Sequence, residues 1–293
     1  MLKGLCITPP IVGRISIGRV VERNGKRLPQ KDDQFTITSQ VQLGDEWVLH
    51  PLDETLRKEA KGKLRTIPVR MPFNDPALNL RASYTLFDRS TGRPICVGNG
   101  ETCTRHTDTG VETLPCPSPG QCAFGGEGCK PYARVHVVIG DEDVLGTFVL
   151  RTTSFNTIRT LTARLQYFNA VSGSLLACMP LELRLRGKST TMSYHTPIYY
   201  VDLVVRSGLT IEEAIDEART LNERRWKAGF DQQALDEAAR RGFANGTFEE
   251  AGEDVPAVVE EFFPEGAGAR GDAQSNGKSS TSLSEQLEAK VSA

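Results

Sequence analysis

The chain has 293 residues, 39% hydrophobic and 25% charged, and its 35 Lys and Arg residues nearly balance 37 Asp and Glu residues. This length suffices for one or two domains with a hydrophobic core, and the composition excludes collagen-like and wholly disordered proteins. The net charge of -2 argues against a general nucleic-acid coat. No apolar run approaches the roughly 20 residues that span a bilayer, and Pro9 and Pro10 interrupt the segment where a secretory signal needs its apolar core. We therefore expect a cytoplasmic protein without membrane contact.

Strand patterns begin near the N-terminus. Residues 14–22 and 34–39 alternate apolar and polar side chains, and the polar stretch between them contains Asn24-Gly25, so this region predicts a β-hairpin. The strand predicted over 64–70 contains Pro68, which lacks a backbone N–H and therefore indicates an edge position. Further strands are predicted over 81–87, 94–98, 132–139, 144–152, 181–186 and 197–206.

A helix is predicted over 156–168. Ser154 or Asn156 could cap its start, and Gly173 is a plausible stop. Apolar residues recur at every third or fourth position and would share one face, namely Ile158, Leu161, Leu165 and Phe168.

Two more helices are predicted in the acidic region that follows. Thr210 and Glu213 form a capping-box pattern before a helix that runs to about residue 227. Asp231 would cap a further helix over 232–243. The tail after Gly266 contains no residues that could form a core and is predicted to be disordered.

Seven cysteines are unevenly placed, and several fall in a stretch over 99–131 that is rich in Gly, Pro and Thr. This stretch has too few apolar residues to order itself, and the chain lacks the secretory features that favour disulfides. Thiolate sulfur suits zinc, which prefers four tetrahedral ligands, and Gly and Pro supply the tight reversals between ligands. The sequence therefore predicts a structural zinc site, at which the metal substitutes for a core, with the ligands Cys103, Cys116, Cys122 and Cys129.

Alternatives stay open for this stretch. It lacks the CxxC knuckles of a zinc ribbon, so it could be an exposed loop with incidental thiols, or hold a redox pair. His106 or Asp108 could replace one thiol, and iron could replace zinc. Four sulfur ligands would close the site and make it structural, whereas an open position would permit catalysis.

Charge is distributed asymmetrically in the second half of the chain. Residues 144–190 are basic, whereas residues 210–265 are acidic. Alternate strand positions and the neighbouring helix could join their basic side chains into an anion or nucleic-acid contact, formed by Arg159, Arg164, Arg184, Arg186 and Lys188. The alternative is an ordinary solvated strand face that the acidic segment neutralises.

Motifs for catalysis are missing. Gly187-Lys188-Ser189 looks like the end of a P-loop, but Glu182 stands where that motif requires its first glycine. The sequence contains no GxSxG elbow and no HExxH, and its four histidines are scattered. Nothing assembles a general acid and base, so we expect a protein without enzymatic activity.

A longer pattern covers about residues 80–205. Cys129-Lys130-Pro131 opens one strand, and Gly146-Thr147-Phe148 opens the next. Thr153-Ser154-Phe155-Asn156 then precedes a helix, and Ser172-Gly173 precedes a leucine-rich strand. This pattern resembles proteins of bacterial mobile elements that are often labelled hydrolase or metal-binding protein. These are in turn similar to the recombination directionality factors of actinophage large serine integrases.

The resemblance implies a non-enzymatic accessory protein of a phage or mobile element. Recombination directionality factors bind the integrase near its coiled-coil motif and switch it from integration to excision, so the implied partner is a site-specific recombinase. Either the acidic C-terminal helices or the basic region 144–190 would form the contact surface. The label of the mobile-element proteins leaves a metal-dependent hydrolase as one alternative. A DNA-binding accessory protein of recombination or repair is another.

These patterns together predict an α+β protein with an antiparallel β-rich core, a packed helix, a zinc-stapled cysteine loop and an acidic helical C-terminus. We expect five regions, which are an N-terminal β-rich region (1–98), a cysteine-rich metal loop (99–131), a β-α-β core module (132–208), an acidic helical segment (209–264) and a disordered tail (265–293).

Overall fold

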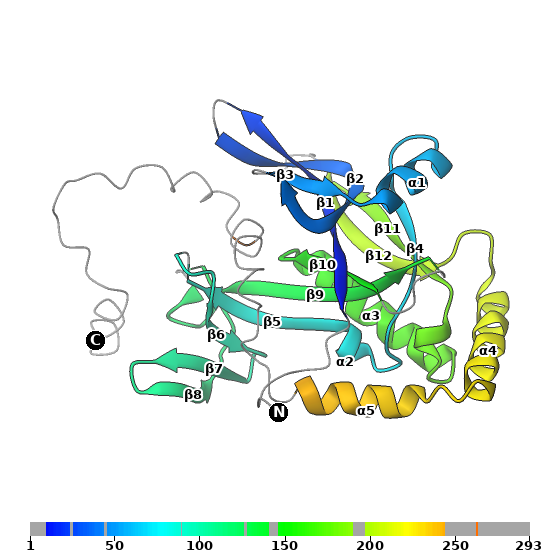
Figure 1. Ribbon diagram of the computed structural model, residues 1–293. Helices are drawn as coiled ribbons and strands as arrows, with labels where there is room; N and C mark the ends of the chain where they lie inside the picture. Colours follow the sequence, from blue (N-terminus) through cyan, green and yellow to red (C-terminus); the bar gives the residue numbers. More distant parts are fainter. Residues whose placement is uncertain are drawn as a thin grey trace.

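The computed structural model describes residues 10–23, 26–43, 46–88, 90–125, 128–140, 146–189, 197–243 and Phe262 (Figure 1). The strands are β1 (Ile11–Arg23), β2 (Lys26–Leu43), β3 (Glu46–Leu49), β4 (Thr66–Arg70), β5 (Leu80–Phe87), β6 (Pro94–Gly98), β7 (Thr102–Thr107), β8 (Gly110–Pro115), β9 (Lys130–Ile139), β10 (Thr147–Thr152), β11 (Leu181–Lys188) and β12 (Ile198–Val205). The helices are α1 (Pro51–Glu59), α2 (Pro76–Asn79), α3 (Phe155–Val171), α4 (Ile211–Lys227) and α5 (Gln232–Phe243), and η2 (Leu176–Cys178) is a 3-10 turn. The fold class is α+β, as predicted.

The described strands form a large mixed sheet. Its main path runs in the order β3-β2-β1-β10-β9-β5-β6-β7-β8, and β4 links β9 to β11 and thereby to β12. The predicted hairpin of β1 and β2 is confirmed. β1 also runs parallel to β10, with Arg14 opposite Val149 and Ile15 opposite Leu150, so the predicted antiparallel β-rich core is a mixed sheet at this point. Pairing between strands so distant in sequence leaves no local pattern to read.

The main hydrophobic core lies between the sheet and α3. The predicted apolar face of α3 is confirmed, since all four of its residues are buried. Burying one such side chain contributes about 1.5–3 kcal/mol. The strands meet this helix with alternate residues of β9, β11 and β12, namely Ala133, Val135, Val137, Ile139, Leu181, Leu183, Val201 and Leu203.

The predicted helix boundaries are confirmed by their hydrogen bonds. Ser154 caps α3, since its hydroxyl accepts from the Thr157 N–H at 3.4 Å, and Gly173 follows the end of the helix with a φ of 68°. Thr210 and Glu213 form the capping box that begins α4. The Asp231 carboxylate accepts from the Ala234 N–H at 2.9 Å at the start of α5. These local signals were readable because each is satisfied within four residues.

Several elements were not predicted. β7 and β8 form a hairpin inside the stretch that was expected to lack regular structure. α1 begins after His50, whose Nδ1 accepts from the Leu52 N–H at 3.3 Å, and it packs the partly buried Leu52 and Leu56 against the main core. Its one fully buried residue is Asp53, whose carboxylate accepts from the Ile37 N–H at 2.9 Å and pairs with Arg57. Two leucines and a buried carboxylate give only a weak apolar period in the sequence.

The strand that contains Pro68 does not lie at an edge, so that expectation was wrong. β4 pairs with β11 over Thr66–Val69 and with β9 over Val69–Arg70. Pro68 accepts from the Gly140 N–H at 3.3 Å, just beyond the end of β9. Because the pairing with β9 ends there, the missing N–H of Pro68 costs no ladder hydrogen bond on that side.

The tail over 265–293 lies outside the described residues. Among the helices of the described ranges, none is long and apolar enough to cross a membrane.

Candidate metal centre and charged surfaces

Strand register places two cysteines on one face of the β6–β7 hairpin. Cys96 pairs with Arg105, and Gly98 pairs with Cys103. Side chains of paired residues share a face, and so do residues two positions apart on one strand. Cys96, Gly98, Cys103 and Arg105 therefore lie on the same face of this hairpin.

Cys116 reaches this face from the end of β8. Its N–H donates to the Glu101 carbonyl at 2.8 Å, which holds the chain against the β6–β7 turn. A Cβ atom placed on Gly98 would lie 2.6 Å from Cys116 Sγ and 2.8 Å from Cys103 Cβ. Gly98 is therefore required because the Cys116 sulfur occupies the space of a side chain.

The loop after Cys116 is folded tightly. The Cys122 N–H donates to the Ser118 carbonyl at 3.0 Å, and the Gly125 N–H donates to the Cys122 carbonyl at 2.9 Å. A Cβ atom on Gly125 would lie only 1.8 Å from the Pro119 carbonyl oxygen, so the backbone approach at this point excludes any side chain. The Gly and Pro residues of this loop thus hold Cys122 in a defined turn.

A small core surrounds the sulfur atoms. Cys96, Cys103 and Cys116 are buried with Leu86, and the side chain of Cys129 packs against them. Three of the four predicted cysteines, Cys103, Cys116 and Cys129, therefore lie in one small core with Cys96, whereas Cys122 is not part of that core. The cysteines of this thiol cluster (Cys96, Cys103, Cys116, Cys122 and Cys129) are free thiols, as is the buried Cys178 beside α4. Cys6 lies outside the described residues.

Burial keeps two thiols of the cluster protonated at neutral pH. It raises the pKa of Cys103 to about 11, and the neighbouring Cys96 and Cys116 raise this pKa further. Burial likewise raises the pKa of Cys129 to about 12, with further contributions from Cys96, Cys122 and Cys116. A metal ion would therefore have to displace thiol protons.

Arg105 is the cation of the thiol cluster. Burial alone would lower the pKa of Arg105, but interaction with Cys96, Cys103 and Cys122 raises it. Its guanidinium carbon lies 4.4 Å from the centre of the Phe124 ring, in cation–π geometry. A positive charge is thus held beside sulfur atoms that would become negative on binding a metal.

The sulfur atoms of the thiol cluster do not surround a single point. Within the described residues, no three side chains of His, Cys, Asp or Glu are arranged as metal ligands. Strand alternation places His106 on the opposite face from Cys103, and Asp108 lies in the turn between β7 and β8. The described geometry therefore does not bring these two residues toward the cluster, as an open catalytic metal site would need.

The predicted basic patch is assembled around a buried carboxylate. Asp202 of β12 is only 3% exposed and accepts from Arg164 Nε and Arg186 Nε, each at 3.0 Å. Glu182 similarly accepts from Arg184 Nε at 3.0 Å. The role of these two acids was not predicted, because only the register of β11 with β12 places Asp202 opposite Arg184.

The remaining predicted cations lie on and beside α3. Lys188 Nζ donates to the Asn156 side-chain oxygen at 3.1 Å, and Arg159 is exposed on α3. The cations of the patch outnumber its two buried acids. The surface therefore keeps a positive balance, although part of it is neutralised internally.

A row of arginines crosses the main sheet on the face opposite the core. Arg81 of β5 pairs with Arg134 of β9, and Arg134 pairs with Arg151 of β10. His136 follows on the same face of β9, where burial, together with these three arginines, lowers its pKa to about 3. His136 is thus a buried neutral residue of β9.

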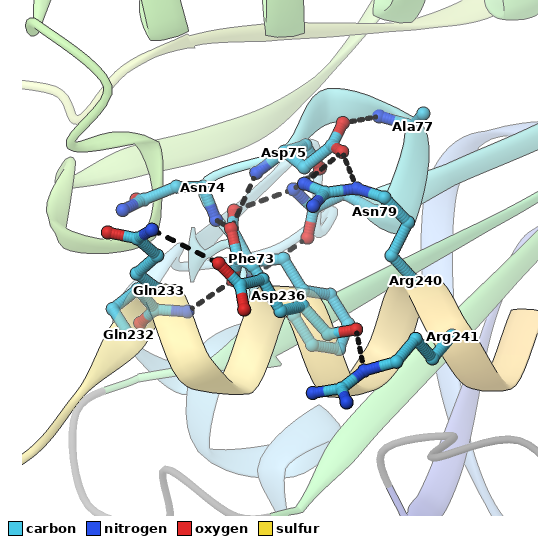
Figure 2. Close-up of polar contacts among 11 residues, drawn as sticks. Phe73, Asn74, Asp75, Ala77, Asn79, Gln232, Gln233, Asp236, Arg240 and Arg241 are labelled. Carbon is cyan, nitrogen blue, oxygen red and sulfur yellow. Dashed lines mark hydrogen bonds and ion pairs between the residues drawn. The ribbon is translucent and has the colours of Figure 1, made fainter.

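The α5 helix docks through a polar contact (Figure 2). The Asp236 carboxylate accepts from the N–H groups of Asn74 and Asp75, both at 3.1 Å, and from Gln232 Nε2 at 2.8 Å. Arg240 pairs with Asp75 at 2.8 Å. Burial raises the pKa of Asp236, while these hydrogen bonds oppose the shift. The apolar part of the contact is small and consists of Phe73, Leu78, Leu235 and Ala239.

A polar cleft of about 500 Å³ lies beside this contact, between the end of α3 and α5. Its described lining includes Asn169, Ser174 and Glu237 but neither His nor Cys.

Comparison with known families identifies the body of the chain. Residues 12–206 match the family described as Gp3-like, recombination directionality factor-like. The matched segment contains nearly the whole described sheet, from the second residue of β1 to the end of β12, with α3 and the thiol cluster, whereas α4 and α5 lie beyond it. Comparisons with curated proteins and with solved structures give no match. By the extent of the family match, this chain belongs to the recombination directionality factor-like family.

Proposed function

We propose that this chain is a non-enzymatic accessory protein of a phage or mobile element that binds a serine integrase and switches it toward excision. The observation that carries this proposal is the family match over residues 12–206, which includes nearly all of the described sheet. A switch of this kind depends on a binding surface rather than on a catalytic pocket.

The α4–α5 corner is the surface that we assign to the integrase. Trp226 is 75% exposed and Phe230 is 44% exposed. The Arg225 guanidinium carbon lies 5.4 Å from the Phe230 ring centre. Trp and Arg are the residue types that most often dominate binding energy at protein interfaces. Because this corner lies beyond residue 206, it would supply specificity for one integrase rather than the activity shared by the family.

The test combines binding with recombination. The full chain is added to the integrase encoded by the same element, and excision and integration products are measured on separate DNA substrates. We expect stimulated excision and inhibited integration. Binding without any change in the product ratio would overturn the proposed switch, and failure to bind would overturn the partner.

The assignment of the surface has its own variants. The double substitution Trp226→Ala and Phe230→Ala should weaken integrase binding about tenfold or more. Tyr167→Ala is the matched control, since Tyr167 is 51% exposed on α3 and lies away from this corner in sequence. Equal losses of integrase affinity in the double variant and in Tyr167→Ala would contradict the assignment of the α4–α5 corner.

Zinc binding is the second part of the proposal. The thiol cluster supports it, since its cysteines come from β6, β7, the end of β8 and the loop that follows. The role assigned to the metal is structural, because four sulfur ligands would leave no position for a substrate.

DNA contact is a second candidate function, favoured by the way Asp202 holds Arg164 and Arg186. Both guanidinium groups use Nε for this contact, which orients two half-exposed cations on one surface. Replacing Arg186 by Gln should lower DNA retention, and should reduce the dependence of binding on salt by about one phosphate contact. No retention of the unmodified chain on DNA at low salt would eliminate this function.

A further inference from the structure

The thiol cluster contains more sulfur atoms than a closed zinc site uses. Zinc in structural sites is held by four ligands, whereas Cys96 adds a thiol to the four predicted from sequence. One cysteine must therefore lie outside the coordination sphere. The contacts of the cluster indicate which one.

Cys103 is already fixed within the hairpin. It is 3% exposed, and its thiol donates to the Pro115 carbonyl at 3.7 Å, across the β7–β8 pair. Its Cβ atom lies against the backbone of Gly98. Cys103 thus fills the base of the cluster, where it packs as a small apolar side chain.

Cys129 is the thiol that joins the loop to the hairpin. It is partly exposed, packs against the buried core of the cluster, and interacts electrostatically with Cys96, Cys116 and Cys122. Cys96 and Cys116 are held by the strand region, whereas Cys122 and Cys129 belong to the loop. Two ligands would thus come from each side of the cluster.

We infer that a zinc ion is bound by Cys96, Cys116, Cys122 and Cys129, with Cys103 packed beneath as a core thiol. This inference rests on the zinc binding proposed above and replaces one predicted ligand, Cys103, by Cys96. A metal held by these four residues would join the loop to the end of the sheet.

Arg105 completes the site as a positioning residue. Ligation exchanges four thiol protons for one Zn²⁺, so the zinc and its four thiolates carry a net charge of -2. Arg105 interacts with Cys96 and Cys122 and is held over the Phe124 ring. Its guanidinium offsets part of that negative charge from outside the coordination sphere.

The test measures zinc and thiolate ligation in the full chain. Zinc content is determined by mass spectrometry after exchange into metal-free buffer, and cobalt substitution reports sulfur ligands through charge-transfer absorption. We expect one zinc ion per chain and the spectrum of a tetrahedral site with four thiolates. Ser substitutions of Cys96, Cys116, Cys122 and Cys129, made one at a time, should each lower zinc affinity tenfold or more.

Two control variants test whether the four ligands are the ones inferred. Cys103→Ala and Cys178→Ser should retain the metal, since the first removes only a packed thiol and the second lies beside α4. Metal loss in Cys103→Ala together with retention in Cys96→Ser would overturn the set and restore the one predicted from sequence. Circular dichroism of each variant identifies metal loss that merely follows unfolding.

Arg105→Gln should weaken zinc binding about tenfold while leaving the four-thiolate cobalt spectrum intact. A changed spectrum would make Arg105 more than a positioning residue. If the unmodified chain binds no zinc or cobalt, both this inference and the proposed zinc binding fail. The integrase assay is read independently, so it separates that failure from failure of the proposed switch.

Discussion

The main core and the thiol cluster belong to one sheet but are stabilised by different means. The main core collects aliphatic and aromatic side chains from both parts of the sheet, α3 and α4. The buried residues of the thiol cluster are Leu86 and three cysteines, although several partly buried side chains pack around them. Apolar burial can therefore account for the first region, whereas the second depends on close backbone approaches and, in our proposal, on a metal.

The largest effect is expected in the main core. Leu183→Ala removes a fully buried side chain and should lower the free energy of unfolding by about 2–5 kcal/mol in urea denaturation. Leu49→Ala is the control, since Leu49 is 57% exposed, and should change it by less than about 0.5 kcal/mol. Similar losses of unfolding free energy in both variants would contradict the expectation that the buried side chains stabilise the main core.

A smaller effect is expected at the close approach within the thiol cluster. Gly98→Val forces atoms into the space of Cys116 Sγ and Cys103 Cβ, and should destabilise the chain by about 1–3 kcal/mol and reduce zinc binding. Gly120→Val, in the loop that follows β8, is the control, because nothing lies within 4 Å of its Cβ position. Unchanged zinc binding by Gly98→Val would show that the cluster can accommodate a side chain at this position.

Acid titration examines the face of the main sheet opposite the core. Folding lowers the pKa of His136 from 6.5 to about 3, so the unfolded chain binds more protons between these values. Stability from this group is present above pH 6.5 and is lost as the pH falls, by about 2 kcal/mol between pH 7 and pH 5. His136→Gln should remove this part of the pH dependence, whereas His106→Gln in the exposed hairpin should keep it.

The smallest effect is expected at the start of α3. Ser154→Ala removes the hydroxyl that accepts from the Thr157 N–H and should cost about 1 kcal/mol, measured by urea denaturation. Gln166→Ala on an exposed position of the same helix serves as the control. A loss of 3 kcal/mol or more would mean that the main core depends on this cap as strongly as on its packed side chains.

The sequence predicted elements well where their signals are local. The capping residues Ser154, Thr210 and Asp231, and the apolar period of α3, each act within a few residues of the chain. α1 was missed because its anchor is the Asp53 carboxylate, which bonds to the distant Ile37 N–H. The β7–β8 hairpin was missed because Cys103 and Arg105 face the cluster at positions of β7 where an apolar alternation would be expected.

The candidate site was predictable only in outline. Cysteine density located the cluster, but Cys96 was assigned to a strand before it, since nothing in the spacing shows that β6 and β7 pair. The basic patch was likewise recognised from its cations alone. Its organising carboxylate, Asp202, becomes evident only through the register of β12 with β11. Sites built across strands depend on register, which residue patterns specify weakly.

The parallel contact of β1 with β10 sets the order in which the chain can assemble. Thr147 donates to the Pro10 carbonyl through its N–H at 2.9 Å and through its hydroxyl at 3.1 Å, across 137 residues of sequence. Closing so long a loop costs more chain entropy than closing a hairpin, and remote pairings slow folding. During translation, β1 and β2 leave the ribosome long before β10. The edge of β1 that pairs with β10 therefore stays unpaired until about half of the polypeptide has been synthesised.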